Sequence, residues 1–286
     1  MALYATDSDD VIFAADADPQ ARYWCLECFG PVKVRKGVQR FPHFYHVKRT
    51  PQCRLYSKSE DHMRVQTELQ NLFPPQEIVL EKAFPSISRV ADALWEKEKI
   101  AFEIQCSPIQ PPEAEARIRD YRSAGYETIW LLDERLYNKR TLRPSEALLR
   151  SHSAYYLSIP RGRPFSAYDQ FEIFASGARV KKGRPLPVDL RNARVLRSLP
   201  PAEKLPEQIT RRALGSPRHF QNDRLARAVQ SIRYPSLALS LQNWKALEEH
   251  LGKEAAPRPA WRDWLRRYLI EPYMDWLVKV HIWLND

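Results

Sequence analysis

Two short stretches give the strongest indication of the fold: Arg89-Val-Ala-Asp92-Ala-Leu and Ala101-Phe-Glu103-Ile-Gln105. Each sets an acidic residue among apolar neighbours, and the charged run Glu96-Lys97-Glu98-Lys99 lies between them. This pattern predicts two strands joined by a hairpin that turns midway through the charged run. Residues whose numbers sum to 195 then stand opposite each other. That register pairs Asp92 with Glu103 across the two strands, with Cβ atoms about 5 Å apart.

Two opposed carboxylates repel each other unless a positive charge lies between them. Mg²⁺ is often bound by one or two carboxylates plus substrate phosphate, so Asp92 and Glu103 indicate a Mg²⁺ or Mn²⁺ site. Such a site can activate water for phosphodiester hydrolysis. Gln105 shares the strand face of Glu103, because side chains alternate along a strand. The alternative is that Asp92 lies on a solvent face and Glu103 pairs with a nearby lysine.

The elements around this pair are predicted in the order helix, three strands, helix, strand. Pro74-Pro75 ends the first helix, and Pro111-Pro112 opens the second. The predicted elements are the helix Ser57–Phe73, the strands Ile78–Phe84, Arg89–Trp95 and Ile100–Cys106, the helix Ala114–Ser123 and the buried strand Thr128–Leu132. This α-β-β-β-α-β order predicts an α/β domain with a mixed sheet covered by helices.

Cysteine and histidine cluster before this domain. Cys25-x-x-Cys28 has the spacing of a metal-binding knuckle, and His43, His46 and Cys53 follow within 25 residues. Three thiolates and one imidazole make a closed, structural zinc site. On a strand the two histidines face opposite ways, so only one should ligate, and His46 is favoured because it lies nearer Cys53. The alternative is a set of unrelated buried thiols. We also expect a hairpin of Val32–Arg35 with Val38–Tyr45.

Positive charge is concentrated in the middle of the chain. Residues 134–235 carry 21 Lys and Arg against 8 Asp and Glu, a net of +13, whereas the whole chain has +10. The rest of the chain therefore sums to −3. This imbalance predicts a surface that meets a polyanion, with Arg211, Arg212 and Arg218 as phosphate-binding residues. A solvated arginine-rich surface is the alternative.

The chain has 286 residues, enough for two or three small domains. We predict a zinc-ribbon-like module over residues 1–56, the α/β core over 57–150 and a basic, mostly helical region over 151–286. In that last region we expect strands at Tyr155–Ile159 and Gln170–Ala175, an irregular linker beginning at Arg184, and helices over Ser236–Leu251 and Trp261–Leu284.

Neither a membrane span nor an export signal is expected. The chain has no run of 18 or more apolar residues, and its first residues lack the basic start and apolar stretch of a signal peptide. Four cysteines are too few for a disulfide framework in a chain of this length. A cytoplasmic location is therefore predicted.

Several motifs over residues 23 to 133 occur in an order found in a known family. They are Cys25-x-x-Cys28, Pro42-His43-Phe44-x-His46, Cys53, Ser59-x-x-His62, Ala91-Asp92, Glu103-x-Gln105-Cys106-Ser107, Arg117-x-x-x-Tyr121 and Ile129-Trp130-Leu131-Leu132. Together with the element order they resemble the PD-(D/E)XK nuclease superfamily and, more narrowly, the competence protein CoiA family. The resemblance implies a metal-dependent DNA nuclease of natural transformation, acting on incoming DNA before or during recombination.

We assign candidate roles to individual residues accordingly. The candidates are Asp92, Glu103, Gln105 and His62 for catalysis; Asp92, Glu103 and Ile104 for Mg²⁺ or Mn²⁺; Cys25, Cys28, His46 and Cys53 for zinc; and Arg89 and Arg117, with the three arginines named above, for DNA. For His62 the alternative is a hydrogen-bonded, partly buried histidine. Arg89 and Arg117 can equally be structural ion pairs.

Two departures from the superfamily pattern bear on activity. Gln105 replaces the usual lysine, although this is common in the CoiA-like group, and Gln66 stands where a lysine is more usual. The alternative function is therefore a catalytically weak or inactive DNA-binding recombination mediator with a recombinase partner. A restriction-type endonuclease with a zinc reading head is a third hypothesis, but no second module has a clear recognition helix. Single- or double-strand preference stays open, and a homodimer is compatible with the sequence.

Overall fold

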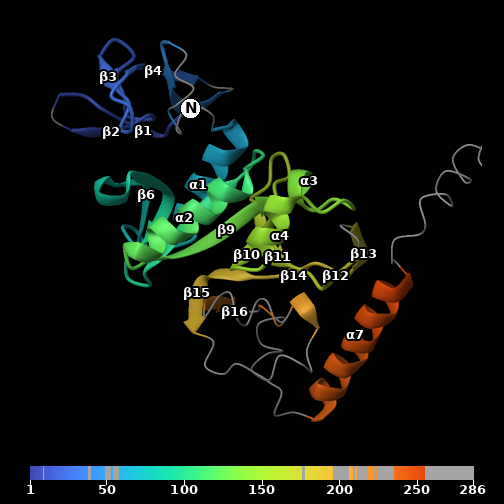
Figure 1. Cartoon of the computed structure of the whole chain (residues 1–286). Helices are drawn as coiled ribbons and strands as arrows, with labels where there is room; N and C mark the ends of the chain where they lie inside the picture. The colour runs from blue at the N-terminus through green and yellow to red at the C-terminus, as the bar shows by residue number, and fades with distance from the viewer. Residues whose placement is uncertain are drawn as a thin grey trace, which may run out of the picture.

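The structure is a computed structural model that describes residues 1–8, 10–37, 40–48, 53, 58–175, 178–195, 206–208, 210, 218–221, 223 and 235–254. A small N-terminal sheet, a central α/β domain and a long helix near the end of the described chain make up the visible architecture (Figure 1).

The central domain is built on a seven-stranded sheet with the order β14-β11-β10-β9-β8-β7-β6. Its strands β8, β9 and β10 run parallel, and the other pairs are antiparallel, so the predicted mixed pairing is confirmed. The strands are β6 (Ile78–Phe84), β7 (Arg89–Trp95), β8 (Ile100–Gln105), β9 (Glu127–Asp133), β10 (Ala154–Ser158), β11 (Ser166–Asp169) and β14 (Leu186–Pro187).

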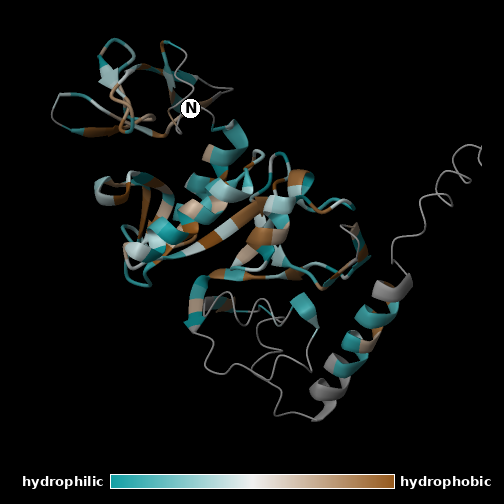
Figure 2. Cartoon of the chain, viewed as in Figure 1, coloured by the Kyte–Doolittle hydropathy of each residue, from teal (hydrophilic) through white to brown (hydrophobic). Residues whose placement is uncertain are grey.

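Helices cover both faces of this sheet. On one face α1 (Glu60–Asn71) packs Met63, Val65 and Leu69 into the main hydrophobic core. On the other face α2 (Pro111–Ser123) and α4 (Pro144–Arg150) pack around Trp130. Because both faces are covered, β7, β8 and β9 are buried almost throughout. Figure 2 shows the hydrophobic residues concentrated along these central strands.

The predicted element order is confirmed: α1, β6, β7, β8, α2 and β9 follow one another along the chain. Ser59 caps α1 by accepting a hydrogen bond from the backbone N–H of His62 at 3.2 Å. Proline at the start of α2 fits the first helical turn, where the missing N–H has no partner to lose. Gly125, with φ of 82°, lies just after the end of that helix.

The N-terminal sheet has five strands in the order β2-β1-β3-β4-β5. They are β1 (Tyr4–Thr6), β2 (Val11–Phe13), β3 (Tyr23–Trp24), β4 (Pro31–Gly37) and β5 (Arg40–His46). The predicted hairpin is the antiparallel pair β4–β5, in which Val34 stands opposite Phe44. A separate small core, with Tyr23, Phe44, Cys25 and Cys53 among its members, holds this sheet together.

The prediction of a mostly helical region beyond residue 150 is not supported. The described residues there form mainly strands up to Gln221: β10, β11, β14, β12 (Glu172–Ala175), β13 (Ala178–Lys182), β15 (Asp189–Val195) and β16 (Arg218–Gln221). The expected linker from Arg184 is wrong, because it contains β14 and β15. These strands pair with partners far away in sequence, which local pattern does not reveal.

The helix predicted at Ser236–Leu251 is confirmed as α7 (Pro235–Glu254). It contacts β12, and the ring of its Trp244 stacks on Phe171 with centroids 4.5 Å apart. The helix predicted at Trp261–Leu284 lies outside the described residues. None of the helices in the described part of the chain is long and apolar enough to cross a membrane.

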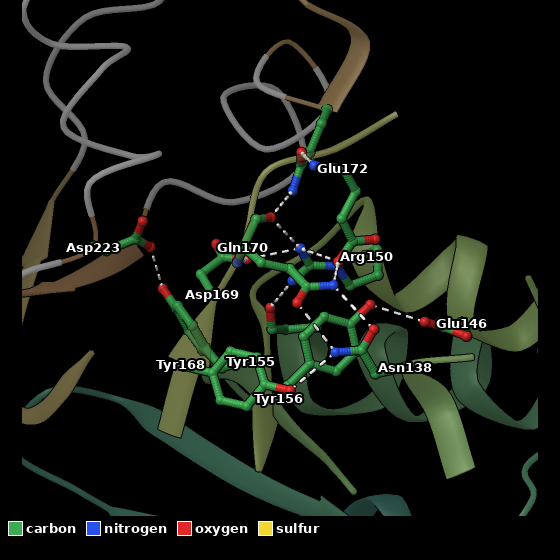
Figure 3. A network of polar contacts seen from close by, with 12 residues as sticks. Asn138, Glu146, Arg150, Tyr155, Tyr156, Tyr168, Asp169, Gln170, Glu172 and Asp223 are labelled. Carbon is green, nitrogen blue, oxygen red and sulfur yellow. Dashed lines mark hydrogen bonds and ion pairs between the residues drawn. The ribbon is translucent and has the colours of Figure 1, made fainter. Parts of the chain in front are cut away.

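A buried polar network ties β11 and β12 to α4 (Figure 3). Arg150 of α4 donates to Asp169 at 2.7 Å and lies 3.4 Å from Glu172, and all three side chains are at most 4% exposed. Arg179 of β13 pairs with Glu172 at 3.0 Å and with Glu146 of α4. Two arginines and three carboxylates are thereby held inside the protein.

Candidate active site and zinc centre

The hairpin register predicted for the acid pair is confirmed. In the β7–β8 pair, Ala93 stands opposite Phe102 and Trp95 opposite Ile100. The same register places Asp92 level with Glu103, on the same face of adjacent strands. Asp92 is 5% exposed and Glu103 is 1% exposed. The two acids are therefore neighbouring buried carboxylates, as the sequence indicated.

Asp92 is contacted by groups from the loop before α1, from α1 and from β8. Its Oδ1 lies 2.8 Å from Nζ of Lys58 and 3.0 Å from Nε2 of His62. Its Oδ2 accepts the backbone N–H of Ile104 at 2.8 Å, just past the end of the strand ladder. Burial alone would raise the pKa of Asp92, but His62 and Lys58 outweigh it and hold that pKa well below its usual range.

Glu103 is held from the other side by helix α2. Tyr121 donates its hydroxyl to Oε1 at 2.7 Å, and Arg117 forms an ion pair with Oε2. Burial raises the pKa of Glu103, and the neighbouring Asp92 raises it further, against the opposing effect of Arg117. The pKa of Asp92 is thus lowered and the pKa of Glu103 is raised. Paired carboxylates with separated pKa values can take different chemical roles.

A third acid, Glu81, continues the row. In the β6–β7 pair, Leu80 stands opposite Ala93 and Lys82 opposite Ala91, so Glu81 lies level with Asp92. Glu81 is buried, with a left-handed φ of 49°, and it accepts an ion-pair contact from Lys58 Nζ at 3.0 Å. Neither Glu81 nor Lys58 is among the candidate site residues predicted from the sequence. The available signal was one acid within the otherwise apolar start of the strand Ile78–Phe84.

A pocket of about 90 Å³ lies beside this row of acids, and Asp92 is the one of the three that lines it. The pocket brings together most of the residues proposed for catalysis and for Mg²⁺, from four different elements and the loops before α1 and after β8. The lining residues are Lys58, Ser59, His62, Arg89, Val90, Asp92, Ile104, Gln105, Cys106, Ser107, Arg117 and Tyr121. Glu103 lies behind this lining, in contact with Arg117 and Tyr121.

The two amides that stand in place of lysine have structural partners. Gln105 donates its side-chain N–H to the backbone oxygen of Ser107 at 2.6 Å. Gln66 is fully buried, donates to the backbone oxygen of Asp92 at 2.7 Å and accepts from Lys58 at 3.4 Å. Both amides therefore hold the backbone around the site in place. Neither supplies the site with positive charge.

Two candidate phosphate-binding arginines line the pocket while held by acids of α2. Arg89 contacts Glu113 and Asp120, each at 2.7 Å. Arg117 bridges Glu103 and Glu113, with 2.9 Å to the latter. Of the three arginines expected in the basic segment, Arg211 and Arg212 lie outside the described residues, and Arg218 begins β16 with its side chain outside the description.

Asp92 and Glu103 offer the donor type that a hard divalent cation takes, whereas the cysteine–histidine cluster is the one group of three or more metal-binding side chains found close together among the described residues. Carboxylate oxygens are the ligands that Mg²⁺ and Mn²⁺ prefer. In the protein alone, Lys58 pairs with Glu81 and Asp92, and Arg117 pairs with Glu103. A divalent cation bound by Asp92 would therefore compete with Lys58 and His62 for that carboxylate.

The N-terminal cysteines gather with one histidine. The ligand atoms of Cys25, Cys28, His46 and Cys53 all lie within 4.8 Å of one another. Sγ of Cys25 is 3.6 Å from Sγ of Cys53, and Sγ of Cys28 is 3.2 Å from Nε2 of His46. His43 instead places its Nδ1 2.7 Å from the backbone oxygen of Phe41. Three thiols and one imidazole are a donor set that can bind zinc.

The turn around the first two cysteines is shaped to leave room for sulfur. The backbone N–H of Glu27 donates to Sγ of Cys25 at 3.4 Å. A Cβ on Gly30 would lie 3.3 Å from Sγ of Cys28, closer than most such contacts, so glycine suits that position. Burial raises the pKa of both Cys25 and Cys53. A bound metal would favour their thiolate forms.

Comparison with known proteins bears on the same segment. Residues 58–164 match the family described as "Competence protein CoiA, nuclease-like domain". The chain is also 26% identical over 117 residues to "Competence protein CoiA" of Bacillus subtilis (strain 168). That match covers 39% of this chain and 31% of the relative, so it spans less than a third of the relative's length. No solved structure gave a significant match.

Proposed function

We propose, since residues 58–164 belong to the CoiA nuclease-like family, that this protein is a metal-dependent deoxyribonuclease of natural transformation. It would act on incoming DNA before or during recombination. The observation that carries the proposal is the pair of buried carboxylates, Asp92 and Glu103, level on adjacent strands beside a pocket lined by cationic side chains. We also propose that the central domain has a PD-(D/E)XK-type fold.

The reaction is hydrolysis of a phosphodiester. A water oxygen bonds to phosphorus, the bond from phosphorus to one ester oxygen breaks, and a proton ends on the leaving oxygen. Asp92, Glu103 and Ile104 would hold Mg²⁺ or Mn²⁺, which supplies a Lewis acid and an activated water. His62, 3.0 Å from Asp92, and Gln105 line the same pocket and would orient the water and the phosphate.

A second candidate function is a DNA-binding recombination mediator with little or no catalysis. One observation favours it: every carboxylate oxygen of Asp92 and Glu103 already has a protein donor. Such a site is electrostatically satisfied in the protein alone. The mediator would work through the basic segment and a recombinase partner. Both proposals include a cytoplasmic location, a homodimer and a chain divided into domains after residues 56 and 150.

Metal dependence separates the two functions. Purified protein would be incubated with end-labelled single- and double-stranded DNA in Mg²⁺, Mn²⁺, Ca²⁺ or EDTA. A nuclease should cleave at least one substrate in Mg²⁺ or Mn²⁺ and none in EDTA. DNA binding without cleavage in any of these conditions would instead support the mediator and contradict the nuclease.

Replacing Arg211, Arg212 and Arg218 with alanine is expected to weaken DNA binding similarly for unrelated sequences, because phosphate contacts carry no sequence information. The slope of log affinity against log salt should become less steep by about 3, since each contact contributes roughly 0.9. Fluorescence anisotropy across a salt series measures both quantities. Replacing Lys33, Lys97 and Lys99, which are exposed and lie outside the segment, removes the same charge as a control.

Normal DNA binding by the arginine variant at moderate salt would contradict this prediction. The basic segment would then be assigned to a protein partner or to a solvated surface. A loss of affinity in the lysine control as large as in the arginine variant would show that overall charge is responsible, with no special role for the three arginines.

A further inference from the structure

The lysine that lines the pocket comes from the loop before α1, and not from the strand position where the superfamily carries it. At the position where the superfamily carries lysine, Gln105 turns its amide toward Ser107 at 2.6 Å. Lys58, in the loop before α1, reaches the site instead. Its Nζ lies 2.8 Å from Oδ1 of Asp92, its side chain is 7% exposed, and it lines the pocket. A lysine so deeply buried is rare unless its charge has partners.

Lys58 is fixed by three acceptors, one for each N–H of an ammonium group. Two are carboxylates: Asp92 at 2.8 Å and Glu81 at 3.0 Å. The third is the neutral side-chain oxygen of Gln66 at 3.4 Å. The Gln66 contact is the longest and pairs no charges, so it is the one that a phosphate oxygen could most readily replace.

Glu81 is built to hold this lysine. Its left-handed φ of 49° is unusual for a residue inside a strand, and such strain persists where surrounding structure demands it. Its carboxylate also accepts the backbone N–H groups of Leu3, at 3.2 Å, and Tyr4, at 3.1 Å. These amides belong to the N-terminal module. The carboxylate is thus held on one side by that module and meets Lys58 on the other.

We propose that Lys58 is a catalytic residue of this site and that Glu81 is its positioning residue. Lys58 would donate a hydrogen bond to a non-bridging oxygen of the scissile phosphate, where negative charge grows as the water oxygen bonds to phosphorus. It keeps its protons throughout, and the leaving ester oxygen takes its proton from the attacking water. The inference rests on the proposed nuclease function.

Position and charge both suit this role. A pre-oriented cation in a water-poor site stabilises developing charge more than a solvated one does. Arg89 and Arg117 also line the pocket. Arg89 pairs with two acids of α2, and Arg117 pairs with one acid of α2 and with Glu103. Lys58 contacts Asp92 directly. It therefore lies closest to the carboxylate that opens into the pocket.

The test compares K58Q, which keeps hydrogen-bond donors but loses the charge, with K58R, which keeps both. K82Q is the matched control, because Lys82 is exposed, lies next to Glu81 and does not line the pocket. Single-turnover cleavage in Mg²⁺ and DNA affinity in Ca²⁺ would be measured for each. K58Q should cleave about 10²–10³-fold more slowly, the loss seen when one such donor is removed.

K58R should recover much of that rate, and K82Q should match the wild type. DNA affinity should change little in all three, because one phosphate contact among many contributes little to binding. E81Q keeps an acceptor for Leu3 and Tyr4 but loses its charge. It should slow cleavage less than K58Q and leave DNA affinity unchanged, which separates positioning from a purely structural role.

Mn²⁺ titration without DNA provides a readout independent of activity. K58Q should bind Mn²⁺ more tightly than the wild type, because Asp92 loses a competing cation. Weaker Mn²⁺ binding by K58Q would mean that the lysine only maintains the shape of the site, and would overturn the proposal. Wild-type cleavage with an equally active K58Q would overturn the role of Lys58 alone. A wild type that does not cleave DNA would overturn both this inference and the proposed function.

Discussion

Protein purified without chelators is expected to contain one zinc ion per chain, and Cys53→Ser is expected to lose it. Cys53 provides a buried thiol within 4.8 Å of the other three ligand atoms, so its loss opens the site. Structural zinc sites of this kind bind with about 10–16 kcal/mol of apparent free energy, and that energy stabilises the fold around them. Elemental analysis gives the zinc content, and near-UV circular dichroism reports on the N-terminal module.

Two matched pairs of variants sharpen this prediction. Cys106→Ser removes the remaining cysteine, which lies at the pocket and outside the cluster, and should leave zinc content unchanged. His46→Ala should lose zinc, whereas His43→Ala should retain it, because His43 is directed at the backbone of Phe41. Full zinc content in Cys53→Ser, or none in the wild type, would contradict the assignment of this centre.

Replacing Arg150 with methionine is expected to lower the free energy of unfolding by about 3–5 kcal/mol, the usual cost of breaking a buried ion pair. The change removes the cation that Asp169 and Glu172 share, while Glu172 keeps its ion pair with Arg179 at 3.0 Å (Figure 3). Methionine keeps much of the side-chain volume, so the loss should report mainly on the broken ion pair with Asp169. Urea denaturation followed by far-UV circular dichroism measures the effect.

Arg191→Met is the control for that measurement. Arg191 forms a similar ion pair with Asp189, at 2.8 Å, but its side chain is 58% exposed. Its replacement should leave the urea midpoint essentially where it is, since exposed pairs contribute little. Equal midpoints for the two variants would contradict the view that the Arg150 network stabilises the packing of β11 and β12 against α4.

Much of the central domain could be predicted from local pattern. The acids at 92 and 103 sit in short apolar runs, and one charged turn fixes the register that joins them. Proline and glycine mark the helix ends, so α2 was predicted within a few residues. These features depend on neighbours a few positions apart, which is the range over which sequence periodicity carries information.

What the sequence did not show depends on distant contacts. Lys58 stands in a loop, and its charge becomes part of the site only because β6 and β7 bring Glu81 and Asp92 beside it. Glu81 adopts a left-handed backbone, which non-glycine residues rarely do. A glutamate in the sequence therefore gives no indication of that conformation. Strands β15 and β16 lie more than twenty residues apart, so neither run indicates its partner.

We propose that Asp92 and Glu103 form the catalytic centre of a DNA nuclease. The most direct test of this proposal is single-turnover cleavage of labelled DNA in Mg²⁺ by the wild type, Asp92→Asn and Glu103→Gln, each first shown to fold and to bind DNA in Ca²⁺. We predict cleavage by the wild type, and a rate lower by on the order of 10³-fold in each variant with DNA affinity retained. Cleavage by Asp92→Asn at the wild-type rate would contradict the claim.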